Sequence, residues 1–595
     1  MDNHEQPPAK RQKIESDATP FALASLSREI SPPPRSNAGI PARKVEGSPH
    51  PEDAKASEMN EISNDSQSTS TFSSTERVPS PFQLTRIRDL PESHNIDTVS
   101  LTDLLGDPLI KECWQFNYLF DVDFVMNAFD EDVRGFVDVK IVHGSWKTDS
   151  SNHIRVAEAA LRYPNVTVKI AHMPEVFGTH HTKMMIILRH DDTAQVVIHT
   201  ANMIHQDWTN MTQAVWRSQP LPFLSEQANG ENAATASSGA VGTGERFKVD
   251  LLRYLKAYEG RTRTLVDQLK LYDFSSIKAA LIASTPNRVS MSSSNPEHHT
   301  SWGWPGLQEI VKKVPCSQNA VKERLSIILQ CSSISTLTNK WLSNFLDAFC
   351  PRSAASSSPF LSASTPTLKP KVNIVFPTPE EIRHSLEGYQ SGTSIHTKIQ
   401  SPAQMKQLTL LRPMFCHWTS EAHYSHPQPT ASASDAARRH WAGEKKVVNG
   451  VRKALRGRAA PHIKTYIRFS SLAQTEIDWA IVTSANISQQ AWGALPDKQG
   501  EVRVCSYEIG VVVWPDLFRE NEGEQVKMVP VFGADMPKVN DRDGESKVKT
   551  RLMGMRMPYD LPLTPYGKTE DPWCATMEYS EPDWRGETYG GYRDT

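Results

Sequence analysis

Apolar and polar positions follow regular patterns through most of the chain after its first hundred residues. Val137, Val139 and Ile141 alternate with charged residues, which is the periodicity of a strand with one buried face. The run 154–161 has the spacing of an amphipathic helix, and 166–168 predicts another strand. Strands that alternate with helices in this way are typical of α/β domains, so we predict an α/β fold.

Polar segments divide this pattern. Residues 1–85 are rich in Ser, Pro, Glu and Asn, so they cannot bury enough apolar surface to offset their ordering entropy. We predict a disordered tail there. A polar stretch before the Trp/Gly motif at 301–304 places a domain boundary near residue 290, which gives an N-terminal domain of 86–290 and a C-terminal domain of 291–595. Three more polar segments predict flexible surface loops: 226–244, 351–370 and 427–437.

Composition limits the number of domains and the cellular compartment of the protein, but it does not indicate its chemistry. The chain has 595 residues, enough for several domains, and its net charge of −3 argues neither for nor against a nucleic-acid partner. Its seven cysteines form no CxxC pair, so we expect free thiols in a reducing compartment. We expect no signal peptide and no membrane-spanning segment. The basic cluster at 10–13 is a candidate nuclear import signal, with a solvated charge run as the equal alternative.

The candidate chemistry lies in a sequence repeat. Each unit has a His-x-Lys triplet, a β-rich stretch that ends in small residues and Asn, and a Trp six residues after that Asn. The first unit has these at His181, Lys183, Asn202 and Trp208. The second unit has them at His462, Lys464, Asn486 and Trp492. The separations from His to Asn are 21 and 24 residues.

Strand geometry gives this spacing a chemical meaning. Residues i and i+2 of a strand project to the same face, so His-x-Lys aims an imidazole and an ammonium at one point. A neighbouring strand that ends in Asn adds a neutral hydrogen-bond donor at the same edge. Two such units that face each other would place two histidines on either side of one phosphate.

The doubled pattern is the signal, because one His-x-Lys triplet is expected by chance among 20 histidines. A third triplet at 396–398 is a control: the next residues include a Pro that breaks a strand, and the corresponding window has no Asn. We reject it as a site. The alternative for the doubled pattern, two structural core histidines, is disfavoured by the match between the units. His180, His199 and His205 have no repeated partner and are predicted to be structural.

These paired units resemble the phospholipase D superfamily. The superfamily motif also has an Asp five residues after the Lys, where this chain has Leu188 and Phe469. The absence of that Asp from both units, with Asn at the end of each, resembles the tyrosyl-DNA phosphodiesterase family. The resemblance extends from about residue 110 to the Asp-Pro-Trp segment at 571–573. Four strings carry it most clearly: 177–185, 461–466, 482–488 and 491–495.

The resemblance implies two similar phospholipase D-like α/β domains around a pseudo-twofold axis, with the active site at their interface, in a monomer. It implies an exonuclease-type hydrolase of the nucleus that needs no metal or other cofactor and acts in DNA repair. Its partners would be single- and double-stranded DNA with 3′ adducts and the topoisomerase I-derived peptide, with no membrane partner. The reaction would remove tyrosyl and other blocking groups and leave a 3′-phosphate.

The same resemblance implies a role for each motif residue. His181 is the nucleophile that forms a phosphohistidine, and His462 is the general acid and then the general base. Lys183 and Lys464 neutralise the phosphate. The two histidines then start in opposite protonation states, which predicts a bell-shaped pH profile.

Other residues are predicted around these four. Asn202 and Asn486 bind the non-bridging oxygens of the phosphate. By resemblance, Gln213 and Glu508 orient the imidazoles in place of the missing Asp. Phe177 is a candidate for stacking on a base, with a core position as its alternative. Four serines are candidates for contacts to DNA phosphates, with turn or capping roles as their alternative: Ser332, Ser333, Ser335 and Ser488.

A basic stretch and two other functions remain open. Residues 445–468 are strongly basic and form either an approach for DNA or a solvated loop. A phospholipase D-type lipid hydrolase would share the paired motifs, but the chain has no amphipathic membrane helix, no lipidation signal and neither superfamily Asp. A non-catalytic DNA-binding scaffold would share the fold, but the two intact units argue against it.

Overall fold

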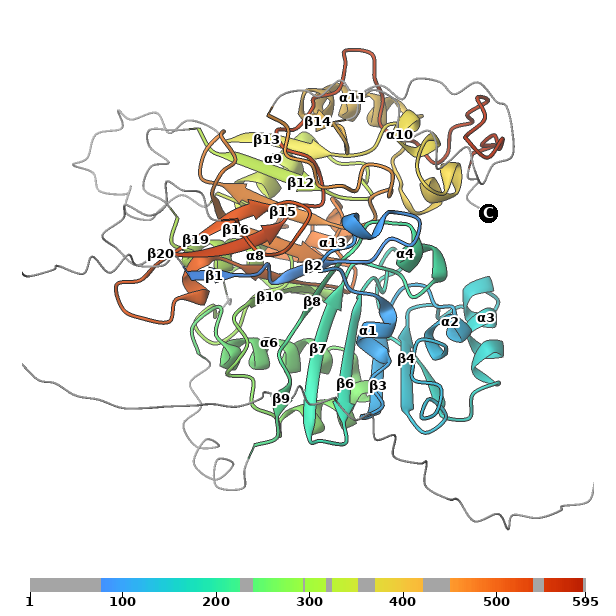
Figure 1. Ribbon diagram of the computed structural model, residues 1–595, viewed down its shortest axis with the longest axis vertical. Helices are drawn as coiled ribbons and strands as arrows, with labels where there is room; N and C mark the ends of the chain where they lie inside the picture. The colour runs from blue at the N-terminus through green and yellow to red at the C-terminus, as the bar shows by residue number, and fades with distance from the viewer. Residues whose placement is uncertain are drawn as a thin grey trace, which may run out of the picture. The chain divides into compact units, whose positions relative to one another are not determined.

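The protein, in a computed structural model, is described over residues 76–224, 239–292, 295–316, 324–350, 370–420, 450–538 and 550–591. These residues form two large β-sheets with helices packed beside them (Figure 1). The α/β fold predicted from the sequence is confirmed. The predicted tail up to residue 75 and most of the three polar inserts lie outside the described residues.

The first sheet has eight strands along the path β2-β8-β7-β6-β3-β4-β5, with β9 paired to β7. Its strands are β2 (Phe82–Leu84), β3 (Ile110–Phe116), β4 (Asp138–His143), β5 (Val166–Ile170), β6 (Met184–Arg189), β7 (Thr193–His199), β8 (Ala214–Arg217) and β9 (Leu221–Pro222).

The central strand β6 is apolar at nearly every position because both of its faces are buried. Met184, Ile186 and Leu188 belong to a core that includes α6 (Gly244–Lys256) and α7 (Arg263–Leu269). Met185 and Ile187 belong to a second core, which includes α1 (Leu101–Leu105), α2 (Val122–Met126) and α3 (Ser151–Ala160). A strand covered on both faces cannot alternate polar and apolar residues.

The second sheet has ten strands along the path β1-β20-β19-β16-β15-β12-β13-β14, with β18 paired to β16 and to β10. Its strands are β1 (Glu76–Val78), β10 (Ala280–Ser284), β12 (Ser326–Gln330), β13 (Lys371–Val375), β14 (Phe415–Cys416), β15 (Thr465–Phe469), β16 (Ile477–Thr483), β18 (Glu508–Val513), β19 (Gln525–Val531) and β20 (Thr550–Arg556). A separate two-stranded sheet pairs β11 (Asn287–Ser290) with β17 (Glu501–Val504).

The sequence repeat extends to the strand topology. In the first sheet β3 is parallel to β4 and antiparallel to β6, and β6–β7 and β7–β8 are antiparallel. The strands β12, β13, β15, β16 and β18 repeat these four pairings in the second sheet. The protein therefore consists of two similar halves. We refer to residues 82–272 as the N-terminal half and to residues 280–591 as the C-terminal half.

Strand pairing corrects two boundaries predicted from the sequence. Strands β1 and β2 form within the last ten residues of the predicted tail, where β1 pairs in parallel with β20 and β2 pairs with β8 (Figure 1). Strand β10, predicted in the N-terminal domain, pairs with β18 of the second sheet. These short segments have no clear periodicity of their own, and the partner strands that order them lie far away in the sequence.

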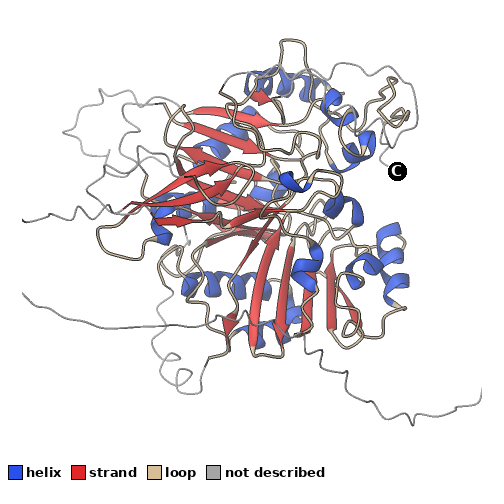
Figure 2. Ribbon diagram, viewed as in Figure 1, coloured by secondary structure: helices blue, strands red, loops and turns tan. Residues whose placement is uncertain are grey.

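The remaining helices cover the sheets and link their strands (Figure 2). They are α4 (His205–Thr209), α8 (Trp304–Lys313), α9 (Asn339–Ala348), α10 (Pro379–Arg383), α11 (Pro402–Leu411) and α13 (Gln489–Trp492). The 3₁₀ helices are η1 (Glu92–His94), η2 (Glu259–Thr262), η5 (Gly388–Ser394), η6 (Arg412–Met414) and η8 (Pro515–Phe518). In the described part of the chain, no helix has the length and apolarity that crossing a membrane requires.

Candidate active site

The two His-x-Lys triplets stand where the halves meet, each directly before a strand: β6 after the first and β15 after the second. The amide of His181 donates to the carbonyl of Tyr507 (N···O 2.9 Å). The amide of His462 donates to the carbonyl of Thr212 (N···O 3.1 Å). Each motif is thus hydrogen-bonded through its backbone to a segment of the opposite half.

Two glycines allow the chain to approach this closely around the first motif. A Cβ atom on Gly178 would lie 2.1 Å from the carbonyl oxygen of Cys505 in the opposite half. A Cβ atom on Gly144 would lie 2.4 Å from the Cβ atom of His180. Any larger residue at these positions would push the first motif away from its neighbours.

His181 is held by a carboxylate of the C-terminal half. Its Nδ1 atom lies 2.9 Å from Oε2 of Glu508. The same oxygen accepts from the hydroxyl of Ser484 at 2.5 Å, and that hydroxyl accepts from the amide of Ile509 at 3.0 Å. Because a carboxylate only accepts, the imidazole proton lies on Nδ1 and Nε2 keeps its lone pair. Glu508 therefore stands where the sequence predicted an orienting residue.

His462 is held from the N-terminal half, and by two residues. Its Nδ1 atom lies 3.1 Å from Nε2 of Gln213 and 2.9 Å from Oδ2 of Asp207. The sequence predicted Gln213 and missed Asp207, which is fully buried in α4 and also accepts from the amide of Asn202 (2.6 Å). Burial works to raise the pKa of Asp207, but the facing His462, these hydrogen bonds and Lys464 together hold it below its ordinary value.

The lysines of the two motifs are both buried in this site. Burial lowers the pKa of Lys183 to about 8, although Glu508 and Asp207 act to raise it. Burial and repulsion by Lys183 lower the pKa of Lys464 well below its ordinary value. Nζ of Lys464 donates to the carbonyl of His462, whereas Nζ of Lys183 has no hydrogen-bond partner among the described residues. An anion bound between the two lysines would raise their pKa values and so favour the charged ammonium forms that burial disfavours.

Two carboxylates join the motifs across the interface, because Asp207 contacts both Asn202 and His462, and Glu508 contacts both His181 and Ser484. The charge of Lys464 acts on His181, and the charge of Lys183 acts on His462. Burial, with Lys464 beside it, lowers the pKa of His462 to about 3, and burial also lowers the pKa of His181. Both imidazoles are therefore neutral at pH 7 without a ligand. Opposite protonation states stay a prediction for the complex, in which the charge of a phosphate raises these pKa values.

Comparison with known proteins identifies the family. The family model described as tyrosyl-DNA phosphodiesterase matches residues 81–567. The chain belongs to the tyrosyl-DNA phosphodiesterase family. It is 30% identical over 575 residues to the probable tyrosyl-DNA phosphodiesterase of Schizosaccharomyces pombe, across 86% of this chain and 96% of that one. It is 27% identical to tyrosyl-DNA phosphodiesterase 1 of Arabidopsis thaliana, across 86% of this chain and 77% of that one.

A solved structure shares the fold. The crystal structure of the yeast tyrosyl-DNA phosphodiesterase matches with a TM-score of 0.55 and 18% identity, over 84% of this chain and 99% of that one. The predicted family is confirmed, and the two similar α/β halves share the fold of that structure.

The two asparagines of this tyrosyl-DNA phosphodiesterase family member are held differently. Oδ1 of Asn486 accepts from the amides of Ser332 (3.1 Å) and Ser333 (3.0 Å) and from the hydroxyl of Ser332 (3.3 Å). Its side-chain NH₂ group remains as the donor for a substrate oxygen. Oδ1 of Asn202 is buried with no partner among the described residues.

The residues predicted to contact DNA fall into two groups. Phe177 is 77% exposed, so the core alternative is wrong and its ring is open to a base. The serines make local contacts: Ser332 and Ser333 hold Asn486, Ser335 donates from its amide to the carbonyl of residue 487 (3.1 Å), and Ser488 caps α13. Their contacts to DNA stay predictions.

Among the histidines outside the motifs, His180 has structural contacts, while the structural roles of His199 and His205 stay predictions. His180 is buried, with its ring nitrogens 3.0 Å from the carbonyl of Asn117 and 3.0 Å from the hydroxyl of Tyr258. Burial lowers the pKa of His199 to about 3, and His205 is exposed at the start of α4. One aromatic residue beside the site was missed: the ring of Tyr118 lies 5.8 Å from that of His181.

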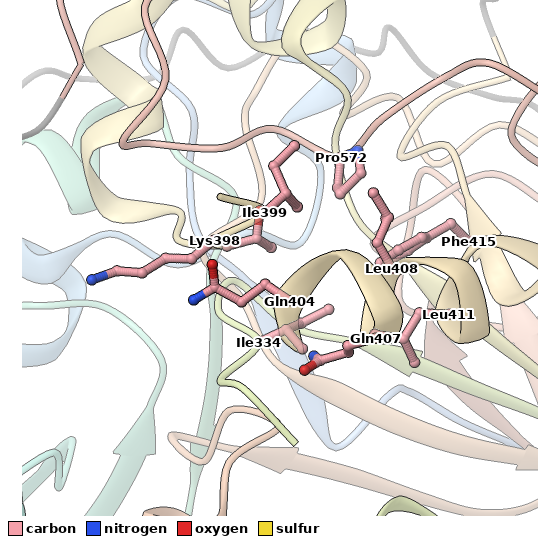
Figure 3. Close-up of a pocket in the computed structure, with 10 residues that line it drawn as sticks. Ile334, Lys398, Ile399, Gln404, Gln407, Leu408, Leu411, Phe415 and Pro572 are labelled. Atoms are coloured by element: carbon pink, nitrogen blue, oxygen red, sulfur yellow. The ribbon is translucent and has the colours of Figure 1, made fainter. Parts of the chain in front are cut away.

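The rejected triplet at 396–398 lies beside the site without forming a third unit. Its first amide donates to the carbonyl of Ser332 (2.8 Å). Lys398 lines a small pocket in the C-terminal half, and Figure 3 shows its amino group pointing away from the apolar lining residues Leu408 and Leu411. The triplet contributes neither of the imidazoles described above.

Two arginines of the basic stretch 445–468 are buried, so these two side chains form neither an approach for DNA nor a solvated loop. Arg456 is 1% exposed, and burial lowers its pKa to about 9. Arg468 is buried in an ion pair with Asp478 (3.0 Å). Residues 445–449 lie outside the described ranges.

Asp207 was detectable from the repeat itself. When the two units are aligned on Asn and Trp, the position five residues after Asn holds Asp207 in the first unit and Ala491 in the second. A carboxylate with no counterpart in the second unit was the signal. Within the described ranges, no group of three or more His, Cys, Asp or Glu side chains is arranged to hold a metal ion.

Proposed function

We propose that this protein hydrolyses the phosphodiester between a tyrosyl residue and the 3′ end of DNA through a phosphohistidine on His181, and leaves a 3′-phosphate. One observation carries the proposal: each motif histidine has a carboxylate 2.9 Å from Nδ1, Glu508 for His181 and Asp207 for His462, and each comes from the opposite half. A carboxylate at Nδ1 leaves Nε2 free to act as a nucleophile or to carry a proton.

In the first step Nε2 of His181 attacks phosphorus. The N–P bond forms, the bond from phosphorus to the tyrosyl oxygen breaks, and that oxygen takes a proton from Nε2 of His462. Lys183 and Lys464 stabilise the charge on the phosphoryl oxygens, together with the NH₂ groups of the asparagines. His462 is protonated at this stage because the bound phosphodiester offsets the repulsion of the lysines.

In the second step the neutral His462 accepts a proton from water. The water oxygen attacks phosphorus, the N–P bond breaks and the 3′-phosphate leaves. His462 is then protonated and His181 is neutral again, which are the protonation states that the site had with the bound phosphodiester before the first step. The residues of this chain supply every proton movement in both steps.

The substrate class is taken from the family. The relatives are named for the bond between tyrosine and DNA, and the exposed ring of Phe177 provides a stacking position for a base. We include topoisomerase I-derived tyrosyl peptides and other 3′-blocking adducts, on single- or double-stranded DNA, in the proposal. We also propose that the protein is a monomer and that it acts in DNA repair in the nucleus.

A labelled oligonucleotide with a 3′-phosphotyrosine tests this function. The wild-type protein should release a 3′-phosphate oligonucleotide, with or without EDTA, and His181→Ala should not. Phosphatidylcholine serves as the comparison substrate for a lipid hydrolase. Release of choline without cleavage of the oligonucleotide would overturn the proposed substrate, and full activity of His181→Ala would overturn the proposed nucleophile.

A further inference from the structure

The ring nitrogen Nδ1 of His462 has two neighbours with opposite hydrogen-bonding requirements. Oδ2 of Asp207 lies 2.9 Å away and Nε2 of Gln213 lies 3.1 Å away. A carboxylate oxygen can only accept and an amide NH₂ group can only donate. Nδ1 can therefore bond to only one of them at a time: to Asp207 when it carries a proton, and to Gln213 when it does not.

The orientation of Gln213 is set by its other contacts. Its Oε1 atom accepts from the hydroxyl of Thr200 (2.8 Å), and that hydroxyl accepts from the amide of residue 214 (2.9 Å). The Thr200 proton therefore points at Oε1, which keeps the NH₂ group on the side of His462. Nε2 of Gln213 also lies 3.3 Å from Oδ2 of Asp207, so the amide has a second acceptor when Nδ1 is protonated.

The proposed reaction decides whether Nδ1 of His462 is protonated and bonded to Asp207, or unprotonated and bonded to Gln213. If Gln213 were the partner of Nδ1, the neutral ring would carry its proton on Nε2, and donation of that proton would leave an imidazolate. An acid that works near neutral pH must instead be an imidazolium, with protons on both nitrogens, which becomes a neutral ring after donation. The Nδ1 proton then needs an acceptor throughout the cycle, and Asp207 is the acceptor within reach.

We propose that Asp207 is the positioning residue that holds the Nδ1 proton of His462, and that Gln213 acts through Asp207 rather than directly on the histidine. This inference rests on the proposed function. It gives both histidines the same arrangement, since Glu508 holds the Nδ1 proton of His181. It also gives a reason for the difference inside the repeat: the second unit has Ala491 where the first has Asp207, and the second unit supplies its carboxylate from Glu508 instead.

The surroundings of Asp207 favour its ionised form. Its carboxylate accepts the amide of Asn202 at 2.6 Å and the NH₂ group of Gln213 at 3.3 Å, and it is fully buried beside His462. A buried carboxylate with these donors and an imidazole opposite gains more as an anion than as a neutral acid.

The tautomer of His462 provides a test that does not depend on activity. In ¹⁵N-histidine NMR spectra at pH 7, assigned by difference with His462→Gln, the wild-type ring should be protonated on Nδ1. In Asp207→Asn the proton should move to Nε2, and in Gln213→Ala it should stay on Nδ1. A wild-type ring protonated on Nε2 would overturn the inference, as would a change of tautomer in Gln213→Ala but not in Asp207→Asn.

Leaving-group chemistry provides the second test. Asp207→Asn should lower kcat by about 10²-fold to 10⁴-fold on a 3′-phosphotyrosyl oligonucleotide, the range for loss of general acid–base catalysis. When the first step is measured alone, in single turnovers, the loss of rate on a 3′-(p-nitrophenyl)phosphate oligonucleotide should be much smaller, because p-nitrophenolate leaves without a proton. The variant should also accumulate the covalent intermediate with the second substrate. Equal losses of first-step rate on the two substrates, or a larger loss in Gln213→Ala than in Asp207→Asn, would contradict the assignment.

A double variant provides the rescue control. In Asp207→Asn/Gln213→Glu a carboxylate stands at the second neighbour of Nδ1, so it can accept the same proton. Its activity on the tyrosyl substrate should exceed that of Asp207→Asn by about tenfold, because part of the rate enhancement from general acid catalysis returns. If the double variant Asp207→Asn/Gln213→Ala regained the same activity, the new carboxylate would not be the cause of the rescue, and position 207 would act only through packing. Wild-type protein inactive on both substrates would count against the proposed function, while the NMR result would still decide the role of Asp207.

Discussion

The N-terminal and C-terminal halves share a motif and a strand order but hold their histidines differently. His181 has one carboxylate partner, Glu508, supported by Ser484. His462 has a carboxylate and an amide beside the same ring nitrogen. In both cases the partners come from the opposite half, so neither half has a complete site. The repeat therefore keeps the imidazole, ammonium and amide groups constant, while the residues that hold each imidazole across the interface differ.

The largest expected difference between the halves is seen when each histidine is removed. His181→Ala should lose about 10⁴-fold or more in kcat and form no covalent adduct, because no nucleophile remains. His462→Ala should also be slow but should accumulate DNA bound to His181, because the water-activating base is missing. Denaturing gel electrophoresis with labelled DNA measures both results. A covalent adduct in His181→Ala would remove the basis for assigning the nucleophile to the N-terminal half.

The lysines should contribute the next largest effect. Lys183→Met should lower kcat by about 10³-fold, since a buried charge that faces the transition state is lost. Lys464→Met should have an effect of similar size, because both ammoniums act on one phosphate. Steady-state kinetics on the tyrosyl oligonucleotide measures this, with thermal unfolding as the control for folding. A loss confined to one lysine would mean that the halves do not share the phosphate.

Glu508→Gln should lower kcat by about 10²-fold, because an amide does not fix the Nδ1 proton of His181 as a carboxylate does. Ser484→Ala, which removes only the second hydrogen bond to the same oxygen, is the matched control and should have a smaller effect. Rapid-quench measurement of phosphohistidine formation isolates the first step. A larger loss in Ser484→Ala than in Glu508→Gln would contradict the role given to the carboxylate.

The pH dependence of anion binding should report the charge of the lysine pair. Burial lowers the pKa of Lys183 to about 8 in the free site, and a bound 3′-phosphate raises it. Binding therefore takes up a proton above pH 8, and affinity for a 3′-phosphate oligonucleotide should fall by up to about tenfold per pH unit as the pH rises above that value. Calorimetry in buffers with different ionisation enthalpies measures the uptake. In Lys183→Met the uptake from this group should disappear, and an unchanged uptake would assign it to another residue.

The smallest expected effect is at the exposed edge of the N-terminal half. Phe177→Ala should raise KM for a single-stranded tyrosyl oligonucleotide by about fivefold, the low end for loss of one stacked base, with little change in kcat. Phe177→Trp is the matched control and should retain binding. A change confined to kcat would show that the ring supports the site rather than the DNA.

Local patterns in the sequence determined the elements and the reacting groups. Alternation predicted β4, and the run 166–168 predicted β5, because burial of a strand face dictates its residue types. The doubled His-x-Lys and Asn pattern, with its family resemblance, predicted His181 and His462 as the reacting groups. The strand position expected for the triplets was wrong, because they precede β6 and β15.

Only the tertiary structure decided the partners of those groups and the limits of the halves. Strands β1 and β10 join the second sheet because of pairings with β20 and β18, hundreds of residues away. Asp207 meets His462 across 255 residues of chain (462 − 207). Contacts of this kind depend on how two folded halves pack. The mismatch with Ala491 distinguishes Asp207 in the sequence, but it does not indicate which imidazole the carboxylate faces.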